Sequence, residues 1–225
     1  MSISEPYLRR PFAFFAVFSA AWILRVALVA WTDMAAETPA IARAIADLWR
    51  AAVWLVLPIL WCLAVDRISP RAAIDQRPGA KPWAAWALAG VYLAASRALA
   101  AANGEGWHNV PTDMPGFDFF AAAIGLVFVA VVEAFVFFGL VLKALRARFG
   151  FWPALATTAA MFAAIQVPGW IAFLEFDATA FAVLFAQVFA FGLLMGGTVR
   201  LAGTLGPAVA LHFLNNALPG FGFAG

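Results

Sequence analysis

The sequence predicts an all-α fold, a polytopic transmembrane helical bundle with about seven spans. Of the 225 residues, 65% are hydrophobic and only 12% are charged. Soluble domains are about half apolar and a quarter charged, so this composition excludes a large soluble domain. The mean hydropathy is +0.92. The apolar residues form runs long enough to cross a bilayer core of roughly 30 Å, separated by short polar links.

The expected spans follow these runs in order along the chain. They are residues 11–31, 48–65, 82–102, 117–142, 151–173, 178–199 and 205–218. The first run follows Arg9 and Arg10, as in a signal peptide, but it is too long and no small-residue cleavage site follows it. We therefore expect a retained first span. The Ala-rich segment 33–47 favours an interfacial helix.

The charges of the links predict the orientation of the chain. Basic links are the N-terminus, residues 66–81, residues 143–148 and Arg200, whereas residues 32–47, 103–118 and 174–178 are acidic or neutral. The two kinds of link alternate along the chain. Because basic links stay in the cytoplasm, we expect the N-terminus to be cytoplasmic and the C-terminus to lie outside.

The same composition predicts one integral membrane domain, with three spans in residues 1–116 and four in residues 117–225. Cys62 is the only cysteine, so no internal disulfide can form. The net charge of +2 is small, which excludes a nucleic-acid surface and leaves membrane lipids as expected partners. The high content of Ala and aromatic residues is typical of a multi-pass protein of the bacterial inner membrane.

One ionisable side chain, Glu133, lies deep inside the apolar run 117–142. Asp118 and Lys143, near the two ends of this run, can reach the water boundary, but Glu133 cannot. A carboxylate at such a depth costs on the order of 3 kcal/mol unless it is paired, protonated or hydrated. Glu133 therefore predicts a partner or a reaction inside the membrane.

Three further polar residues of later spans are candidates to meet this carboxylate. Gln166 lies in the fifth span, and His212 and Asn216 lie in the last. His212 and Asn216 are four residues apart and share one helix face, whereas Asn215 points away from it. With a helix rise of 1.5 Å per residue, these groups reach overlapping depths. We expect a shared cavity in the middle or inner half of the membrane.

The pattern resembles the CPBP family, which comprises CAAX prenyl endopeptidases and the bacteriocin-processing and self-immunity proteins also called Abi proteins. The resemblance covers residues 117–218, so residues 117–225 are expected to form a CPBP-like core. The first family motif is Glu-Glu-x-x-x-Arg followed by Gly, and here it reads EAFVFFG from Glu133. Ala134 and Phe138 replace the second Glu and the Arg.

The other two family motifs fall on the remaining polar residues. The second motif is Phe-x-x-x-His and reads FAAIQ here, so Phe162 is kept and Gln166 replaces the His. The third, His-x-x-x-Asn, is matched by His212 and Asn216. The resemblance implies an endopeptidase in which these residues activate water and stabilise an oxyanion near the carboxyl end of a peptide or lipidated protein substrate.

The roles of single residues follow from this resemblance. Glu133 would be the general base, and His212 and Asn216 would polarise the substrate or donate to the oxyanion. Gln166 cannot titrate, and its amide is a poor zinc ligand beside imidazole. We therefore expect no cofactor, with zinc disfavoured, and a glutamic type of mechanism in which the Gln166 amide orients the water.

Two other functions are left open by the residues. In the first, the protein is a catalytically inactive accessory or scaffold subunit that binds a partner membrane protein. Glu133 would then only bond His212 or Asn216 and fix helix packing. A transporter is disfavoured, because the spans show no repeated halves.

Two arginines lie inside the expected spans, near the outer boundary. For Arg25 and Arg97 we expect snorkelling to water, or ion pairs with Asp33 and Glu105. Binding of an anionic lipid or substrate is the alternative.

Overall fold

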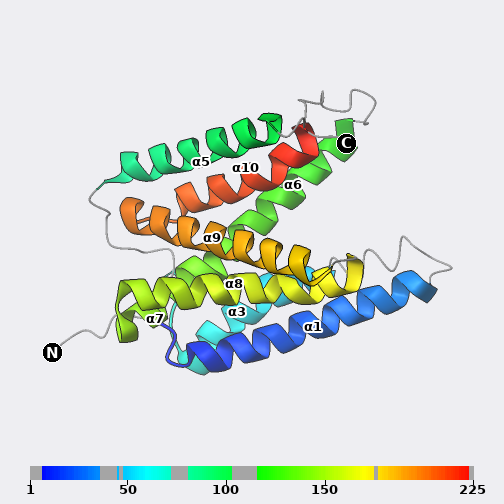
Figure 1. Cartoon of the computed structure of the whole chain (residues 1–225). Helices are drawn as coiled ribbons and strands as arrows, with labels where there is room; N and C mark the ends of the chain where they lie inside the picture. The colour runs from blue at the N-terminus through cyan, green and yellow to red at the C-terminus, as the bar shows by residue number, and fades with distance from the viewer. Residues whose placement is uncertain are drawn as a thin grey trace. The chain divides into compact units, whose positions relative to one another are not determined.

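The structure is a computed structural model, and it describes residues 7–35, 45, 48–71, 81–102, 116–174 and 177–222. All regular secondary structure within these residues is helical, which confirms the all-α fold (Figure 1). The interfacial helix expected at 33–47 lies mostly outside the described residues. Residues 103–115, which include Glu105, His108 and Asp113, also lie outside the described residues.

Five helices in the described part of the chain are long and apolar enough to cross a membrane. They are Pro11–Trp31, Leu48–Asp66, Ala123–Phe149, Phe151–Phe173 and Ala178–Ala202. The two other expected spans are also helices, namely α5 (Pro82–Ala102) and α10 (Gly206–Gly222). The chain is therefore a multi-pass membrane protein.

The chain divides into two compact units that each combine segments from both halves of the sequence. Unit 1 is Met1–Ile74 with Val136–Leu194, and unit 2 is Asp75–Phe135 with Met195–Gly225. Unit 1 contains α1 (Pro11–Ala35), α7 (Leu142–Phe149) and α8 (Phe151–Phe173). Unit 2 contains α5, α6 (Gly116–Glu133) and α10. The remaining long helix, α9 (Ala178–Ala202), contributes residues to both units.

The core of unit 1 is a cluster of aromatic rings. Phe18 meets Trp54 edge-on, with ring centroids 4.8 Å apart, and Phe137 meets Phe162 in the same way at 5.4 Å. Phe18 and Phe137 lie 6.2 Å apart and connect the two pairs. Such edge-to-face pairs add about 0.5–1.5 kcal/mol each beyond area burial. The cluster joins α1 to the second and fourth expected spans and to α8.

Two of the spans depart from α-helical geometry. The second span contains π-helical turns at η1 (Ala52–Val56) and η2 (Trp61–Asp66), on either side of α3 (Leu57–Leu60). Pro58 in α3 has no N–H to donate to the fourth residue before it, and its ring clashes with that carbonyl, so a wider turn relieves the crowding. The fourth span is π-helical at η3 (Ala134–Val141), which begins directly after Glu133.

The outward faces of these helices are apolar. Leu48, Ile171, Trp83 and Ile124 are each about 70% exposed. A soluble monomer rarely carries so much exposed apolar surface, so these side chains are suited to contact lipid tails.

Candidate active site

Glu133 is the last residue of α6 and is 7% exposed. In the described residues of α6 beyond 122, every other side chain is apolar. The π-helical segment η3 starts at the next residue. Because π-helical turns are rare and often occur at functional sites, this change of geometry marks the Glu133 position independently of its charge.

His212 lies opposite this carboxylate, on α10. Its Nε2 atom is 3.6 Å from Glu133 Oε2, and the residue is 4% exposed. Both residues belong to unit 2, where α10 packs against α6. The distance exceeds that of a direct hydrogen bond. The two atoms are close enough to bond one shared water molecule, about 2.8 Å from each.

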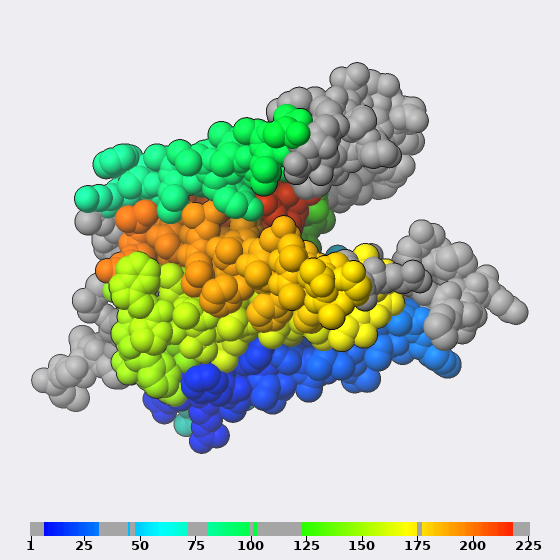
Figure 2. All heavy atoms as spheres, viewed as in Figure 1, coloured from blue at the N-terminus to red at the C-terminus, as the bar shows by residue number. Residues whose placement is uncertain are grey.

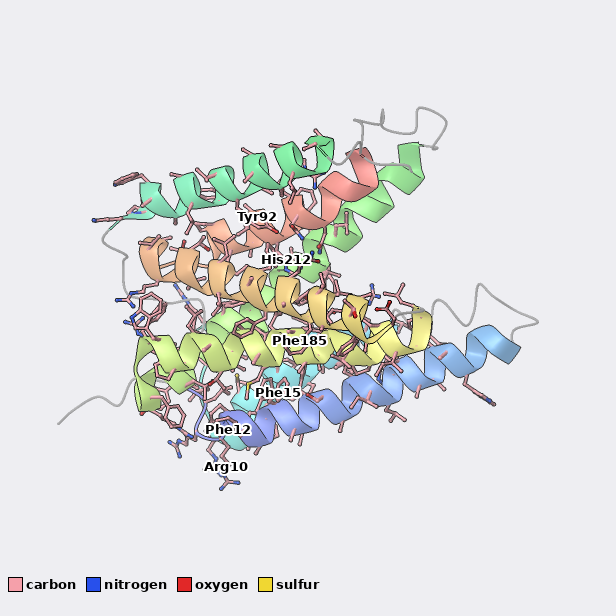
Figure 3. The ribbon with its side chains drawn as sticks, in the orientation of Figure 1. Arg10, Phe12, Phe15, Tyr92, Phe185 and His212 are labelled. Carbon is pink, nitrogen blue, oxygen red and sulfur yellow. The ribbon has the colours of Figure 1, made fainter. Side chains whose placement is uncertain are left out.

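Asn216 lies one helical turn beyond His212 and is half-buried. The two residues therefore share a face of α10, as the spacing predicts. Asn215 faces a different helix, because its Oδ1 atom accepts a hydrogen bond of 3.0 Å from the Tyr92 hydroxyl of α5. Figure 3 labels Tyr92, on α5, and His212, on α10.

Tyr92 is a polar contact of α10 that the sequence interpretation missed. It lies near the middle of the third expected span, outside the family motifs, and its hydroxyl is a polar group on a mostly apolar helix. The chain has only two tyrosines, and a Tyr hydroxyl inside a membrane span needs a hydrogen-bond partner. This need could have identified Tyr92 as a polar contact from the sequence. It does not identify the partner of the hydroxyl.

The two substitutions in the first family motif are accommodated by packing. Ala134 and Phe138 are both fully buried. The Phe138 ring lies 5.8 Å from the ring of Phe162, the residue that the second motif keeps. Removing both an acid and an arginine leaves no unpaired charge behind. An aromatic contact has taken the place of the charged groups.

Gln166 lies on α8 in unit 1 and is half-buried. Glu133 and His212 belong to unit 2, where the structure brings them together, and Asn216 lies one helical turn from His212 in the same unit. The assignment of Gln166 to the site stays a prediction from the motif.

The donor atoms of the pair do not suit a tight zinc site. Zinc in proteins takes three or four ligands from His, Cys and carboxylate side chains. No group of three such side chains comes together among the described residues, and Glu133 and His212 supply only two ligands. The expectation that the protein binds no zinc stays a prediction.

The two intramembrane arginines differ from expectation in part. Arg25 is 6% exposed, and its guanidinium carbon lies 4.8 Å above the Trp22 ring, so snorkelling is wrong for this residue and a cation–π contact holds its charge. Arg97 is half-buried on α5. The side chains of Asp33 and Glu105, proposed as partners, lie outside the described residues.

Comparison with known proteins agrees with these motifs. Residues 115–218 match a family model described as type II CAAX prenyl endopeptidase Rce1-like. The match begins two residues before the resemblance noted in the sequence and ends at the same residue. No curated protein and no solved structure is significantly similar to the chain.

Proposed function

The chain belongs, through residues 115–218, to the Rce1-like family of type II CAAX prenyl endopeptidases, and we propose that it is a divergent intramembrane endopeptidase. The single observation that carries the proposal is the pairing of Glu133 with His212. A buried carboxylate and a buried imidazole lie with Oε2 and Nε2 3.6 Å apart, close enough for both groups to bond the same attacking water. Membrane proteins rarely keep ionisable groups at such depth without a function.

In the proposed reaction, Glu133 acts as the general base. Its carboxylate takes a proton from the bound water as the water oxygen attacks the carbonyl carbon of a peptide bond. The carbonyl oxygen becomes an oxyanion, to which the imidazole N–H of His212 and the amide of Asn216 donate. Glu133 then returns the proton to the leaving amine nitrogen, and the C–N bond breaks. One water is consumed for each bond cleaved.

Gln166 is assigned its role by the family motif alone. Its amide can donate one hydrogen bond to an oxyanion and accept another from the attacking water. This role needs no metal ion, which matches the small number of zinc ligands near Glu133. We propose a glutamic rather than a zinc-dependent enzyme.

The substrate follows from the family and from the position of the pair within a span. We propose a peptide or lipidated protein cleaved close to the membrane, near its carboxyl end. The site is buried among helices that face lipid, so a lipid anchor would bring the scissile bond to it. We further propose that the membrane is a bacterial inner membrane.

The experiment compares the purified protein with Glu133→Gln and His212→Ala in lipid nanodiscs. The probe is a fluorogenic farnesylated peptide ending in a CAAX sequence. Because general-base catalysis contributes about 10²–10⁴-fold, Glu133→Gln is expected to lower kcat/KM by at least 100-fold. His212→Ala and Gln166→Ala are expected to lower it as well, and dialysis against a chelator is expected to leave it unchanged.

Asp177→Asn provides the matched control, because it makes the same carboxylate-to-amide change at an exposed site. Asp177 accepts a 2.7 Å hydrogen bond from the Ala180 N–H at the start of α9, and asparagine keeps this acceptor. This variant is expected to cleave at the wild-type rate. Cleavage that persists in both Glu133→Gln and His212→Ala shows that the catalytic assignment is wrong.

The second candidate, an inactive scaffold subunit, is favoured by one observation. Ala134 and Phe138 replace charged groups of the first motif and are packed into the core, as expected where charge is no longer needed. This function predicts no cleavage by the wild-type protein and stoichiometric co-purification of one membrane protein. That interaction would survive Glu133→Gln, because the isosteric amide keeps the packing.

A further inference from the structure

Four arginines come together at the end of unit 1 that holds the start of α1. They are Arg9, Arg10, Arg67 and Arg148, and we call them the arginine cluster. All four are exposed. They come from three segments: the residues before α1, the residue after η2, and the last turn of α7.

Two hydrogen bonds to the backbone of Arg9 bring these segments together. The Arg148 guanidinium donates to the Arg9 carbonyl. The Arg9 N–H donates to Asp66 Oδ2 at 3.2 Å, and Asp66 directly precedes Arg67. The cluster is therefore a consequence of tertiary structure, since its members lie far apart in the sequence.

Asp66 is the one acidic side chain in the described residues of these three segments, and it faces inward. It is 1% exposed, and its Oδ2 atom also accepts the Trp61 indole N–H at 3.0 Å. Its Oδ2 atom thus accepts two hydrogen bonds inside the protein. The exposed side chains of the arginine cluster thus carry a net positive charge.

Exposed aromatic rings border the cluster. Phe12 is 49% exposed and Phe149 is 52% exposed, and their ring centroids lie 6.4 Å apart. Trp152, at the start of α8, is 71% exposed. Figure 3 shows Arg10 and Phe12 at the same end of α1, and Figure 2 shows this end against the surface near residue 150.

We propose that the arginine cluster and this aromatic border bind an anionic phospholipid. The surface changes from guanidinium groups to exposed rings within about one helical turn of α1, or about 5 Å. A phospholipid changes from phosphate to acyl chain over a similar distance. Arginine pairs with phosphate through two parallel hydrogen bonds, and aromatic rings settle at the membrane–water boundary. An acidic soluble protein would match the charge but leave the rings unpartnered.

The side of the membrane agrees with this ligand. The positive-inside pattern places these links in the cytoplasm, where anionic lipids give the leaflet a negative surface potential. The cluster lies in unit 1, whereas Glu133 and His212 lie in unit 2. The inference is therefore independent of the proposed peptidase activity.

The experiment measures thermal unfolding of the purified, delipidated protein during titration with dioleoyl phosphatidylglycerol. Phosphatidylglycerol is expected to raise Tm, and dioleoyl phosphatidylcholine and inorganic phosphate are not. Each cluster charge near the surface contributes about five-fold to binding. Arg10→Gln and Arg67→Gln are therefore each expected to weaken it about five-fold, and the double variant about 25-fold. Neither change removes a hydrogen bond described above.

Arg50→Gln is the matched control. Arg50 belongs to the same unit and the same span as Asp66, but it lies near the opposite end of that span. This variant is expected to bind phosphatidylglycerol like the wild type. Equal stabilisation by phosphatidylcholine or by inorganic phosphate overturns the proposal. Equal losses in Arg50→Gln and Arg10→Gln, or stabilisation by poly-glutamate instead of lipid, also overturn it.

Discussion

The hydrogen bond between Tyr92 and Asn215 offers a direct measurement of how α5 is held to α10. Tyr92→Phe removes only the hydroxyl, which donates to Asn215 Oδ1 at 3.0 Å. Hydrogen bonds between transmembrane helices average about 0.6 kcal/mol and reach about 1.7 kcal/mol at most. Both residues are half-buried, so water competes for them and the value should lie near the average. We expect a coupling free energy of about 0.6 kcal/mol, or about three-fold in the unfolding equilibrium.

A double-mutant cycle separates this bond from other effects of the substitutions. The cycle uses Tyr92→Phe, Asn215→Ala and the double variant, and tryptophan fluorescence follows unfolding by SDS in mixed micelles. Tyr7→Phe is the control, because Tyr7 is the only other tyrosine and its hydroxyl makes no hydrogen bond to the residues that the structure describes. It is expected to change stability by less than about 0.3 kcal/mol. A coupling free energy of zero would refute the claim that this bond holds α5 to α10.

Two further predictions concern packing in unit 1, and both are checked by the same unfolding measurement. Phe138→Arg places a guanidinium at a fully buried position beside Phe162 and should lower the free energy of unfolding by about 3 kcal/mol or more. Phe138→Met should lower it clearly less. Equal losses would show that the site tolerates charge. Gly192→Ala should cost about 1–3 kcal/mol, because the new Cβ would meet Ala159 Cα and Cβ at 3.1 Å. Gly197 lies on the same helix, and a Cβ added there would meet no atom within 4 Å, so Gly197→Ala should be neutral or stabilising. Similar losses of stability at both glycines would contradict the close approach of α8 and α9.

Much of the fold could be predicted from hydrophobicity alone. The third and fifth expected spans, residues 82–102 and 151–173, coincide with α5 and α8. The side chains of a span face either lipid or other helices, so they are apolar over its whole length. Its backbone N–H and C=O groups must form hydrogen bonds within the span, so long apolar runs form helices. The π-helical turns were not predictable by the same rule, because the apolar pattern of η3 is continuous and carries no period that distinguishes it from an α-helix.

The candidate site was predictable in its members but not in its contacts. Glu133 stands out by its charge, and its partner His212 was proposed from motif order and helical spacing. The structure adds the 3.6 Å contact between them. It also adds Tyr92, which no motif contains, and it shows that Phe138 replaces an arginine by packing on Phe162. Which side chains meet across helices depends on helix rotation, and a uniformly apolar helix does not encode its rotation.

The sequence by itself therefore determined the membrane-spanning helical class, the approximate span boundaries and the few polar residues inside them, because the transfer of each side chain between water and lipid is a local property. Only the tertiary structure decided that Glu133 meets His212 and that Arg9 and Arg148 lie side by side. These contacts join residues distant in the chain, and close packing of helices selects them.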